Sequence, residues 1–133
     1  MTGVLTCFDL RFPESFRALR AKGCQAFVIV AAWPKQRVAH WKALLVARAI
    51  ENQAWVIGVN GSGEDFGTEL GGGSMIVGPD GSVVLDLVDE SASQGAVIAA
   101  GLADQIRAEF PFHDSAIPDL LGHSSAFPVV RSA

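Results

Sequence analysis

Three short apolar runs in the first half of the chain are typical of buried strands, covered on both faces. They are residues 3–7 (GVLTC), 24–32 (CQAFVIVAA) and 55–60 (WVIGVN). Two helices are predicted between them. One begins at Pro13, because proline suits the first helical turn, and the other runs from about His40 to Gln53. The resulting order, β-α-β-α-β, is that of an α/β fold.

The second half of the chain predicts more strand than helix. A Gly-rich loop over residues 61–73 leads into two strands within 74–88, joined around Pro79-Asp80-Gly81, a strong turn signal. A further strand is predicted at 96–102, a short helix at 102–110 and an irregular tail at 111–133. Residues 1–110 would therefore form the folded unit, a mixed sheet of some six strands. We expect its helices on one face, so that the other face lacks a cover.

The second predicted helix combines polar and large apolar residues on one stripe. At about 100° per residue, Arg48, Glu51 and Asn52 fall on the same side as Trp41 and Leu44, while the opposite side is also apolar. A helix that is apolar almost all round is buried on both sides. Buried polar groups must satisfy one another. We therefore expect Arg48 and Glu51 to pair, either as a purely structural brace or as support for an adjacent active-site loop.

Composition and charge narrow the choice of partners. Hydrophobic residues make up 50% of the chain and charged residues 18%, so we expect some apolar surface to face another chain or a missing part of the protein. The net charge of −4 argues against a nucleic-acid partner. Residues 1–48 carry a net charge of +6 and residues 49–133 a net charge of −10. The two parts either face one another or the first forms a cationic pocket for an acidic small molecule.

Several features of the sequence indicate the cellular compartment of the protein. Apolar runs approaching about 20 residues are lacking, so no membrane span is predicted. The first residues do not resemble a signal peptide. Two cysteines are too few for a disulfide scaffold. These observations predict a reduced, cytoplasmic protein.

Cys7 is the first candidate for chemistry because it lies between a predicted strand and a predicted helix. A thiol at such a junction can act as a nucleophile, although a single cysteine is also commonly a small buried hydrophobe. Cys24 begins an apolar run and is expected in the core. His40 could face a pocket from the start of its helix, whereas His113 and His123 fall in the tail. Neither a metal-binding spacing nor a phosphate-binding loop is found in the sequence.

Four successive segments carry a resemblance to a known family. The segment CFDLRFPESFR (7–17) resembles the nucleophile motif of the nitrilase, or carbon–nitrogen hydrolase, superfamily, and AAWPKQRVAHW (31–41) resembles its pocket loop. LLVARAIENQAWVIGVN (44–60) is similar to the helix and strand that follow, and GGSMIVGPDGSVV (72–84) to a late hairpin. The tryptophan loop and ARAIENQ look most like the omega-amidase-like branch, which acts on small amides of dicarboxylic acids.

The resemblance implies a fold, a reaction and a set of residues. The family fold is a four-layer α-β-β-α sandwich that commonly dimerises, and its members hydrolyse amides, nitriles or carbamoyl groups without a cofactor. A Cys attacks to form a thioester, a Glu acts as general base and a Lys stabilises the oxyanion. By motif, the nucleophile is Cys7, the backbone N–H of Phe8 is an oxyanion donor, and Ala32 and Trp33 line the acyl pocket. Supporting positions are Arg11 and Glu14, which would brace the nucleophile turn, together with His40, Arg48 and Glu51.

One departure from the family pattern shapes the prediction. In the family the Glu and the Lys precede the Cys, but the six residues before Cys7 include neither, and Lys22, Lys35 and Lys42 all follow it. The chain is therefore expected to be the C-terminal half of such an enzyme. The partners would be a small amide substrate and either a missing N-terminal half or further copies of the chain. The alternatives are a catalytically inactive remnant, an associating subunit, or a thiol-dependent binding or redox protein.

Overall fold

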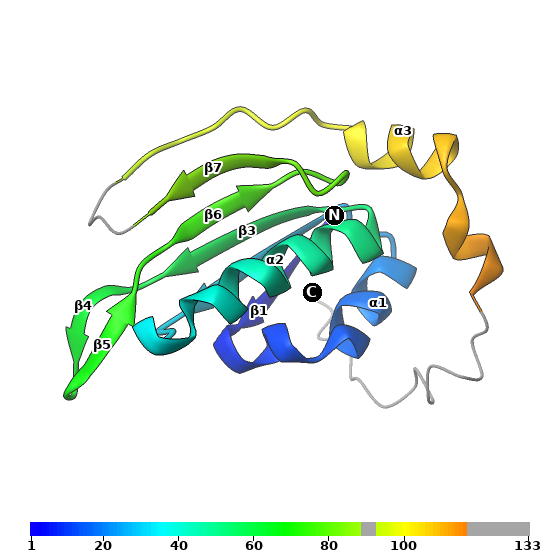
Figure 1. The fold of residues 1–133 in the computed structure, drawn as a ribbon. Helices are drawn as coiled ribbons and strands as arrows, with labels where there is room; N and C mark the ends of the chain where they lie inside the picture. Colours follow the sequence, from blue (N-terminus) through cyan, green and yellow to red (C-terminus); the bar gives the residue numbers. More distant parts are fainter. Residues whose placement is uncertain (89–92, 117–133) are drawn as a thin grey trace, which may run out of the picture.

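A five-stranded mixed sheet forms the centre of the protein, in a computed structural model that describes residues 1–88 and 93–116 (Figure 1). The strand order is β1-β2-β3-β6-β7. The first three strands are parallel, and β6 and β7 are antiparallel to their neighbours. The strands are β1 (Thr2–Thr6), β2 (Ala26–Ala31), β3 (Trp55–Asn60), β6 (Ser74–Val77) and β7 (Val83–Leu87).

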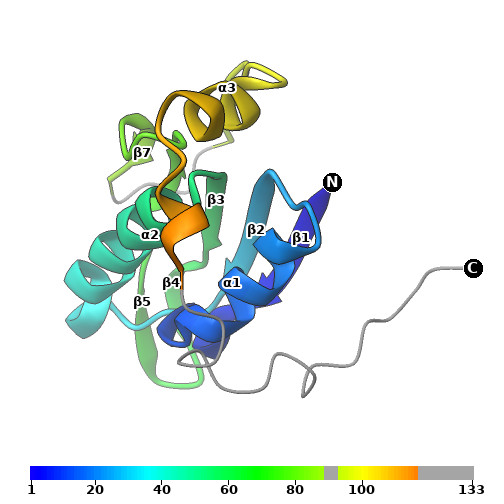
Figure 2. The same ribbon diagram turned by 90° about the vertical axis from the view of Figure 1, so that its right-hand side faces the viewer.

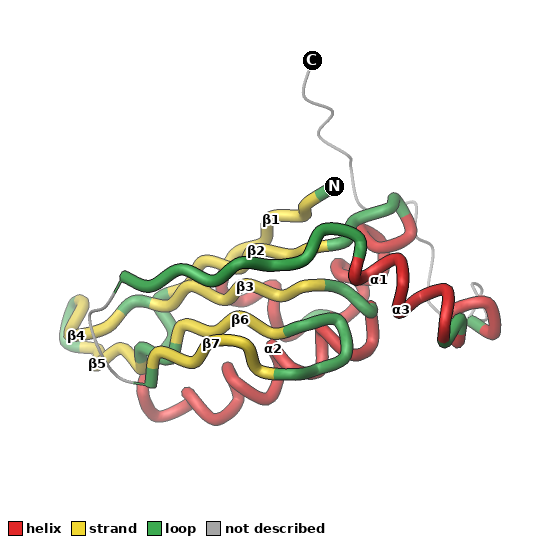
Figure 3. Tube along the Cα trace, turned by 90° about the horizontal axis from the view of Figure 1, so that it is seen from above, coloured by secondary structure: helices red, strands yellow, loops and turns green. Residues whose placement is uncertain are grey.

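Two helices, α1 (Pro13–Ala21) and α2 (Val38–Asn52), cover one face of this sheet (Figures 1 and 3). A third helix, α3 (Leu102–Glu109), lies beyond the end of α2 (Figure 2). There the guanidinium of Arg107 donates to the carbonyl oxygens of Cys24, Asn52 and Gln53 at 2.8–3.2 Å. Short 3₁₀ helices connect the elements: η1 (Cys7–Arg11), η2 (Lys35–Arg37) and η3 (Phe112–Ser115). The α/β fold, with a mixed sheet and helices, is as predicted.

The close contact between α2 and β3 depends on Gly58. A Cβ atom at that position would come within 2.6–2.8 Å of Leu45 and Trp41 on α2. The indole N–H of Trp41 also donates to the carbonyl of Gly73 at 2.8 Å. The helix is thereby tied to the sheet both by packing and by a buried hydrogen bond.

The two faces of the sheet differ because successive strand residues point to opposite sides. On the helix-covered face, Phe27, Ile29 and Val56 are fully buried within the core. On the other face, which we call the open face, Val4, Val30 and Val59 are 72%, 45% and 47% exposed. The register pairs Val30 with Val59, so these side chains adjoin one another. The described residues therefore leave the part of the open face around these three valines uncovered, whereas Trp55 on the same face of β3 is buried.

Two predictions about the second half of the chain were wrong. Residues 96–102 do not form a strand: residues 93–99 pass over the sheet, between β2 and β3 in the view of Figure 3, without pairing, and Val97 is 98% exposed. A strand needs a neighbouring edge for its N–H and C=O groups, and this segment has none. The predicted Gly-rich loop instead contains a hairpin of β4 (Ser62–Asp65) and β5 (Thr68–Gly71). The residues that the structure describes thus form five strands in the main sheet and two in a separate one.

Other differences concern boundaries. The second helix begins at Val38, two residues before the predicted His40, and ends one residue before Gln53. The first two strands begin and end one or two residues away from the predicted 3–7 and 24–32. The predicted tail starts with η3, and the rest of it, including His123, lies outside the described residues.

Candidate active site

Cys7 is held in an unusual backbone conformation at the end of β1. Its φ angle is +35°, in the left-handed region that residues other than glycine seldom adopt. Such strain costs on the order of 1–3 kcal/mol and tends to be concentrated at functional sites. The thiol is half-buried against the edge of the core. Cys7 is thus the strained, partly accessible first residue of η1, not a fully buried hydrophobe.

Hydrogen bonds on both sides of Cys7 fix this turn. The backbone N–H of Thr6 donates to the Asp9 carboxylate at 2.9 Å, and the N–H of Phe12 donates to the Asp9 carbonyl at 2.9 Å. Asp9 therefore ties the residue before Cys7 to the end of η1. The role of Asp9 was missed by the sequence analysis, although an acidic residue two positions after the Cys was a visible signal.

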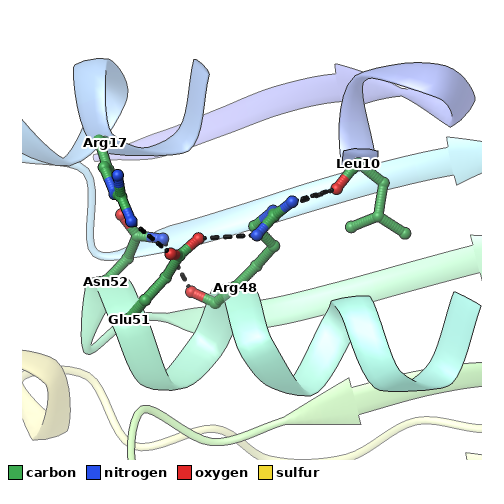
Figure 4. Close-up of polar contacts among 5 residues, drawn as sticks. All are labelled: Leu10, Arg17, Arg48, Glu51 and Asn52. Atoms are coloured by element: carbon green, nitrogen blue, oxygen red, sulfur yellow. Dashed lines mark hydrogen bonds and ion pairs between the residues drawn. The ribbon is translucent and has the colours of Figure 1, made fainter. Parts of the chain in front are cut away.

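Helix α2 supports the same turn from below through Arg48 (Figure 4). The Arg48 Nε and Nη2 groups donate to the carbonyl of Leu10 at 3.1 and 2.8 Å, and Nη1 donates to Glu51 at 2.9 Å. The second oxygen of Glu51 accepts from Arg17 of α1 at 3.0 Å. Arg48 is only 5% exposed. The predicted Arg48–Glu51 pair is confirmed, and its contacts extend to η1.

Asn52 completes the polar stripe of α2. Its side-chain N–H donates to the carbonyl of Arg48 at 2.9 Å, within the helix (Figure 4). The side-chain oxygen of Asn52 is buried and has no hydrogen-bond partner among the described residues. The network expected among Arg48, Glu51 and Asn52 therefore includes the ion pair, but the side-chain oxygen of Asn52 takes no part in it.

The side chain of Arg11 stacks against aromatic rings. Its Cζ atom lies 4.2 Å from the centroid of the Trp33 ring and 5.6 Å from that of Phe8. Of the two residues predicted to brace the turn, Arg11 contacts it, through the Phe8 ring. Glu14 is exposed on the first turn of α1, and within residues 1–88 and 93–116 it forms no hydrogen bond or ion pair.

The loop after β2 is fixed to the neighbouring strand by Asn60. The Asn60 side-chain oxygen accepts from the backbone N–H of Trp33 at 2.6 Å, and its N–H groups donate to the carbonyls of Gly72 at 2.7 Å and Trp33 at 3.3 Å. The indole N–H of Trp33 donates to the carbonyl of Arg37 at 2.8 Å. The Trp33 ring is buried, while Ala32 beside it is exposed. Asn60 was also missed, although a polar residue closing an apolar strand was a signal.

The remaining candidates lie apart from the turn. His40 is exposed on the first turn of α2 and forms no hydrogen bond or ion pair in the part of the chain that the structure describes. His113 stacks on Phe112 with ring centroids 4.4 Å apart, and burial, followed by the charge of Arg20, lowers its pKa. Cys24 is buried as predicted, and burial raises the pKa of its thiol.

The lysines that follow Cys7 have other contacts. Lys42 forms an ion pair with Asp86 at 2.7 Å, and Lys35 forms one with Glu69 at 2.6 Å. Lys35 also borders a surface cleft of about 460 Å³ between η2 and the β4–β5 hairpin, whose lining does not include Cys7. Among the described residues, no group of three or more His, Cys, Asp and Glu side chains could hold a metal ion. Nor does any described helix have the length and apolarity needed to cross a membrane.

Comparison with known proteins places this geometry in a family. The profile of the family described as carbon-nitrogen hydrolase matches residues 1–108. The 2-oxoglutaramate amidase of Paenarthrobacter nicotinovorans is 42% identical over 111 residues, which cover 84% of this chain and 38% of that protein. The chain thus spans well under two thirds of this curated relative.

Solved structures give the same result. The NitFhit protein of C. elegans superposes with a TM-score of 0.83 at 33% identity, over 90% of this chain and 29% of that one. An amidase variant from Nesterenkonia superposes with a TM-score of 0.64 at 35% identity, over 67% of this chain and 34% of that one. That structure contains the acetamide moiety of fluoroacetamide covalently added to the active-site cysteine of the amidase.

Proposed function

This chain belongs to the carbon–nitrogen hydrolase family, and we propose that it is the C-terminal, nucleophile-bearing half of an amidase, with Cys7 as the nucleophile. The observation that carries the proposal is the strained turn at Cys7, which is braced by Asp9 on one side and by Arg48 on the other. A structural cysteine has no need of such a conformation. The covalent adduct on the active-site cysteine of the Nesterenkonia amidase supports the same role.

The proposed reaction proceeds through a thioester. The Cys7 sulfur attacks the amide carbonyl carbon, and the carbonyl oxygen becomes an oxyanion that accepts a hydrogen bond from the backbone N–H of Phe8. Collapse of this intermediate breaks the C–N bond and releases ammonia. Water then attacks the thioester, which releases the acid and restores the thiol. A general base takes the thiol proton and delivers it to the departing nitrogen.

We propose a small ω-amide of a dicarboxylic acid as the substrate. The support comes from the 2-oxoglutaramate amidase, whose name denotes the monoamide of a dicarboxylic acid. The contribution of this chain to the substrate pocket would be the Trp33 loop, which Asn60 holds beside β3, with Ala32 at its exposed edge.

The base and the oxyanion-stabilising lysine of the family would come from another polypeptide segment. Lys42 is paired with Asp86 on the other side of α2, and Lys35 is paired with Glu69 at the β4–β5 hairpin. The same segment would cover the open face around Val4, Val30 and Val59. The open face also favours a second candidate function, an associating subunit that is not itself catalytic.

The test mixes this chain with a separately produced N-terminal half of a related enzyme and measures ammonia release from small ω-amides. We expect activity only in the mixture, and none with Cys7→Ala. Val59→Lys should weaken association of the two halves, as measured by light scattering, without unfolding the chain, because Val59 is half exposed. Association without ammonia release would favour the non-catalytic subunit, and activity that survives Cys7→Ala would refute the assignment.

A further inference from the structure

We propose that residues 110–116, which we call the strap, dock on the helix ends at neutral pH and are released on mild acidification, and that this release loosens the turn at Cys7. The strap follows α3 and contains η3 (Figure 2). The proposal rests on the function proposed above and adds a regulation of the same site. The titrating group is His113, and the end of α2 connects it to Cys7.

The last carbonyl groups of α2 receive partners from α3 and pass the contact on to the strap. The final turn of an α-helix leaves its carbonyl oxygens without partners inside the helix. The guanidinium of Arg107 donates to the carbonyls of Asn52 and Gln53 at 3.2 and 3.1 Å. The Gln53 side chain donates in turn to the carbonyl of Phe110 at 2.8 Å. The end of α2 is therefore capped by residues from a distant part of the sequence.

His113 adds a further contact from η3, through one ring nitrogen only. The ring forms a hydrogen bond with the backbone of Glu51, whereas Nε2 is buried and has no hydrogen-bond partner among the described residues. The bonded nitrogen is therefore Nδ1, which donates to the Glu51 carbonyl in the neutral ring. Phe112 stacks on one face of the ring, with centroids 4.4 Å apart. A proton added at Nε2 becomes a buried N–H group without an acceptor, which is unfavourable.

Three guanidinium groups near the His113 ring also oppose its protonation. Burial is the largest cause that lowers the pKa of His113, and positive charge lowers it further, from Arg20 and Arg17 of α1 and from Arg107 of α3. The bond to the Glu51 backbone acts in the opposite direction, but the net shift is downward. Docking therefore requires the neutral ring, whereas a released histidine regains an ordinary pKa of about 6.5.

The carboxylates around this ring already face arginines. The ion pairs are Glu51 with Arg17 and Arg48, and Asp104 with Arg107, while Asp114 of η3 faces the charge of Arg20. None of these carboxylates is left to balance a protonated imidazole. Protonation thus adds a buried positive charge, and release of the strap into water removes that penalty.

Release of the strap acts on Cys7 through the end of α2. Glu51 bonds to His113 with its backbone and to Arg48 with its side chain. Arg48 in turn donates two hydrogen bonds to the carbonyl of Leu10, in the turn at Cys7. Without the strap, the last turn of α2 loses external partners and frays more readily. The support that Arg48 gives to the turn is then less rigid.

The test follows amide hydrogen exchange of the full chain by mass spectrometry at pH 7.5 and 5.5, with rates corrected for the intrinsic effect of pH. Residues 111–116 report docking, since the N–H groups of Asp114 and Ala116 bond within η3. Residues 7–12 report the turn at Cys7. With a released pKa of about 6.5 and a much lower docked pKa, the released fraction rises about tenfold over this interval. We expect up to that loss of protection in 111–116 and a smaller loss in 7–12.

Three variants separate this switch from a general effect of acid. His113→Gln keeps a side-chain N–H for the Glu51 carbonyl and cannot be protonated, so both losses should disappear. Arg20→Gln should give an intermediate loss, because it removes one charge that opposes protonation of His113. His40→Gln is the matched control, since His40 is exposed on α2, and it should behave as the wild-type chain does.

Two outcomes would overturn the proposal. Equal losses of protection in the wild-type chain and in His113→Gln would mean that the strap does not respond to His113. A loss in 111–116 without one in 7–12 would mean that the strap is not connected to Cys7. Neither readout involves catalysis, so these outcomes leave the nucleophile to be tested by the mixed halves. Conversely, activity that survives Cys7→Ala would refute the proposed function while the exchange rates stayed as expected.

Discussion

The two faces of the sheet are built from the same strands yet have opposite surroundings. Ile29 and Val30 are consecutive residues of β2, and Ile29 is fully buried beneath the helices whereas Val30 is 45% exposed. The covered face includes charged groups that are tied together, such as Arg48 with Glu51 and Lys42 with Asp86. The open face over β1, β2 and β3 has Val4, Val30 and Val59 exposed and no charged side chain.

This difference separates the source of stability from the source of association. A helix-covered face with a fully buried core accounts for the folding of the chain itself. An apolar and uncharged face adds little to that folding while it stays in water, and monomers rarely expose large contiguous patches of this kind. The turn at Cys7 belongs to the covered side, because Arg48 of α2 supports it.

The sharpest test of this comparison uses the neighbouring pair in β2. Ile29→Ala should lower the free energy of unfolding by about 2–5 kcal/mol, because it leaves a cavity in a packed core. Val30→Ala should cost about 1 kcal/mol or less in the isolated chain, as is usual for partly exposed positions. Urea unfolding followed by circular dichroism measures both. Similar losses of stability for the two variants would mean that the open face is packed in solution. The two faces would then not differ as the structure indicates.

The ion pair of the covered face gives the next largest effect. Glu51→Ala removes the carboxylate shared by Arg48 and Arg17 and leaves the nearly buried Arg48 charge uncompensated. We expect a loss of about 2–3 kcal/mol, less than for a fully buried pair, because the Glu51 side chain is 24% exposed. Glu64→Ala, at an exposed position of β4, is the control and should leave the melting temperature nearly unchanged. Equal melting temperatures for the two variants would contradict the role of this pair.

A smaller effect is expected where α2 approaches the sheet. Gly58→Ala would put a methyl group within 2.6–2.8 Å of Leu45 and Trp41, and overpacking of this kind costs about 1–3 kcal/mol. Gly95→Ala is the matched control, since nothing lies within 4 Å of its added Cβ. Thermal unfolding of both variants gives the difference. A Gly58→Ala chain as stable as the control would mean that the helix can move away from β3 at no cost.

Elements with local signals were predictable from the sequence. The strand at 55–60 has the predicted bounds, and α1 begins at Pro13 as its residue type suggested. The turn at Pro79-Asp80-Gly81 is also present, with Gly81 at a φ of +88°. Its Asp80 carboxylate accepts from the Ser82 hydroxyl and backbone N–H, and these bonds lower the pKa of Asp80. Helical periodicity alone was enough to predict the Arg48–Glu51 pair.

Features that depend on distant residues were not predictable. Residues 96–102 have the composition of a strand, but pairing requires an edge that composition does not report. The β4–β5 hairpin turns through Phe66 and Gly67, both with positive φ, and phenylalanine is not a residue that signals such a turn. In the candidate site, Arg11 meets Trp33 and Asn60 meets the Trp33 backbone across long stretches of sequence. Such contacts depend on the order of the strands in the sheet, which local sequence patterns do not indicate.

The smallest expected effect is a dependence of stability on pH, which arises from a histidine on the helical side of the molecule. His113 lies near Arg20 and Arg17 of α1 and near Arg107 of α3, and burial, together with these charges, lowers its pKa in the folded state. Its neutral form is therefore favoured by folding. The resulting stability is present above the unfolded pKa of about 6.5 and is lost as the pH falls below it toward the lower folded pKa.

His113→Gln should remove this dependence while keeping a neutral polar side chain. Urea unfolding at pH 7.5 and 5.5 is compared between the two proteins, so that the carboxylates common to both cancel. The wild-type chain should lose more stability over this interval than the variant, by less than any of the differences above. The open face of β1, β2 and β3 has no ionisable group that could contribute. An equal loss of stability in both proteins would mean that His113 is solvated in the folded state. The buried part of the molecule would then not include η3.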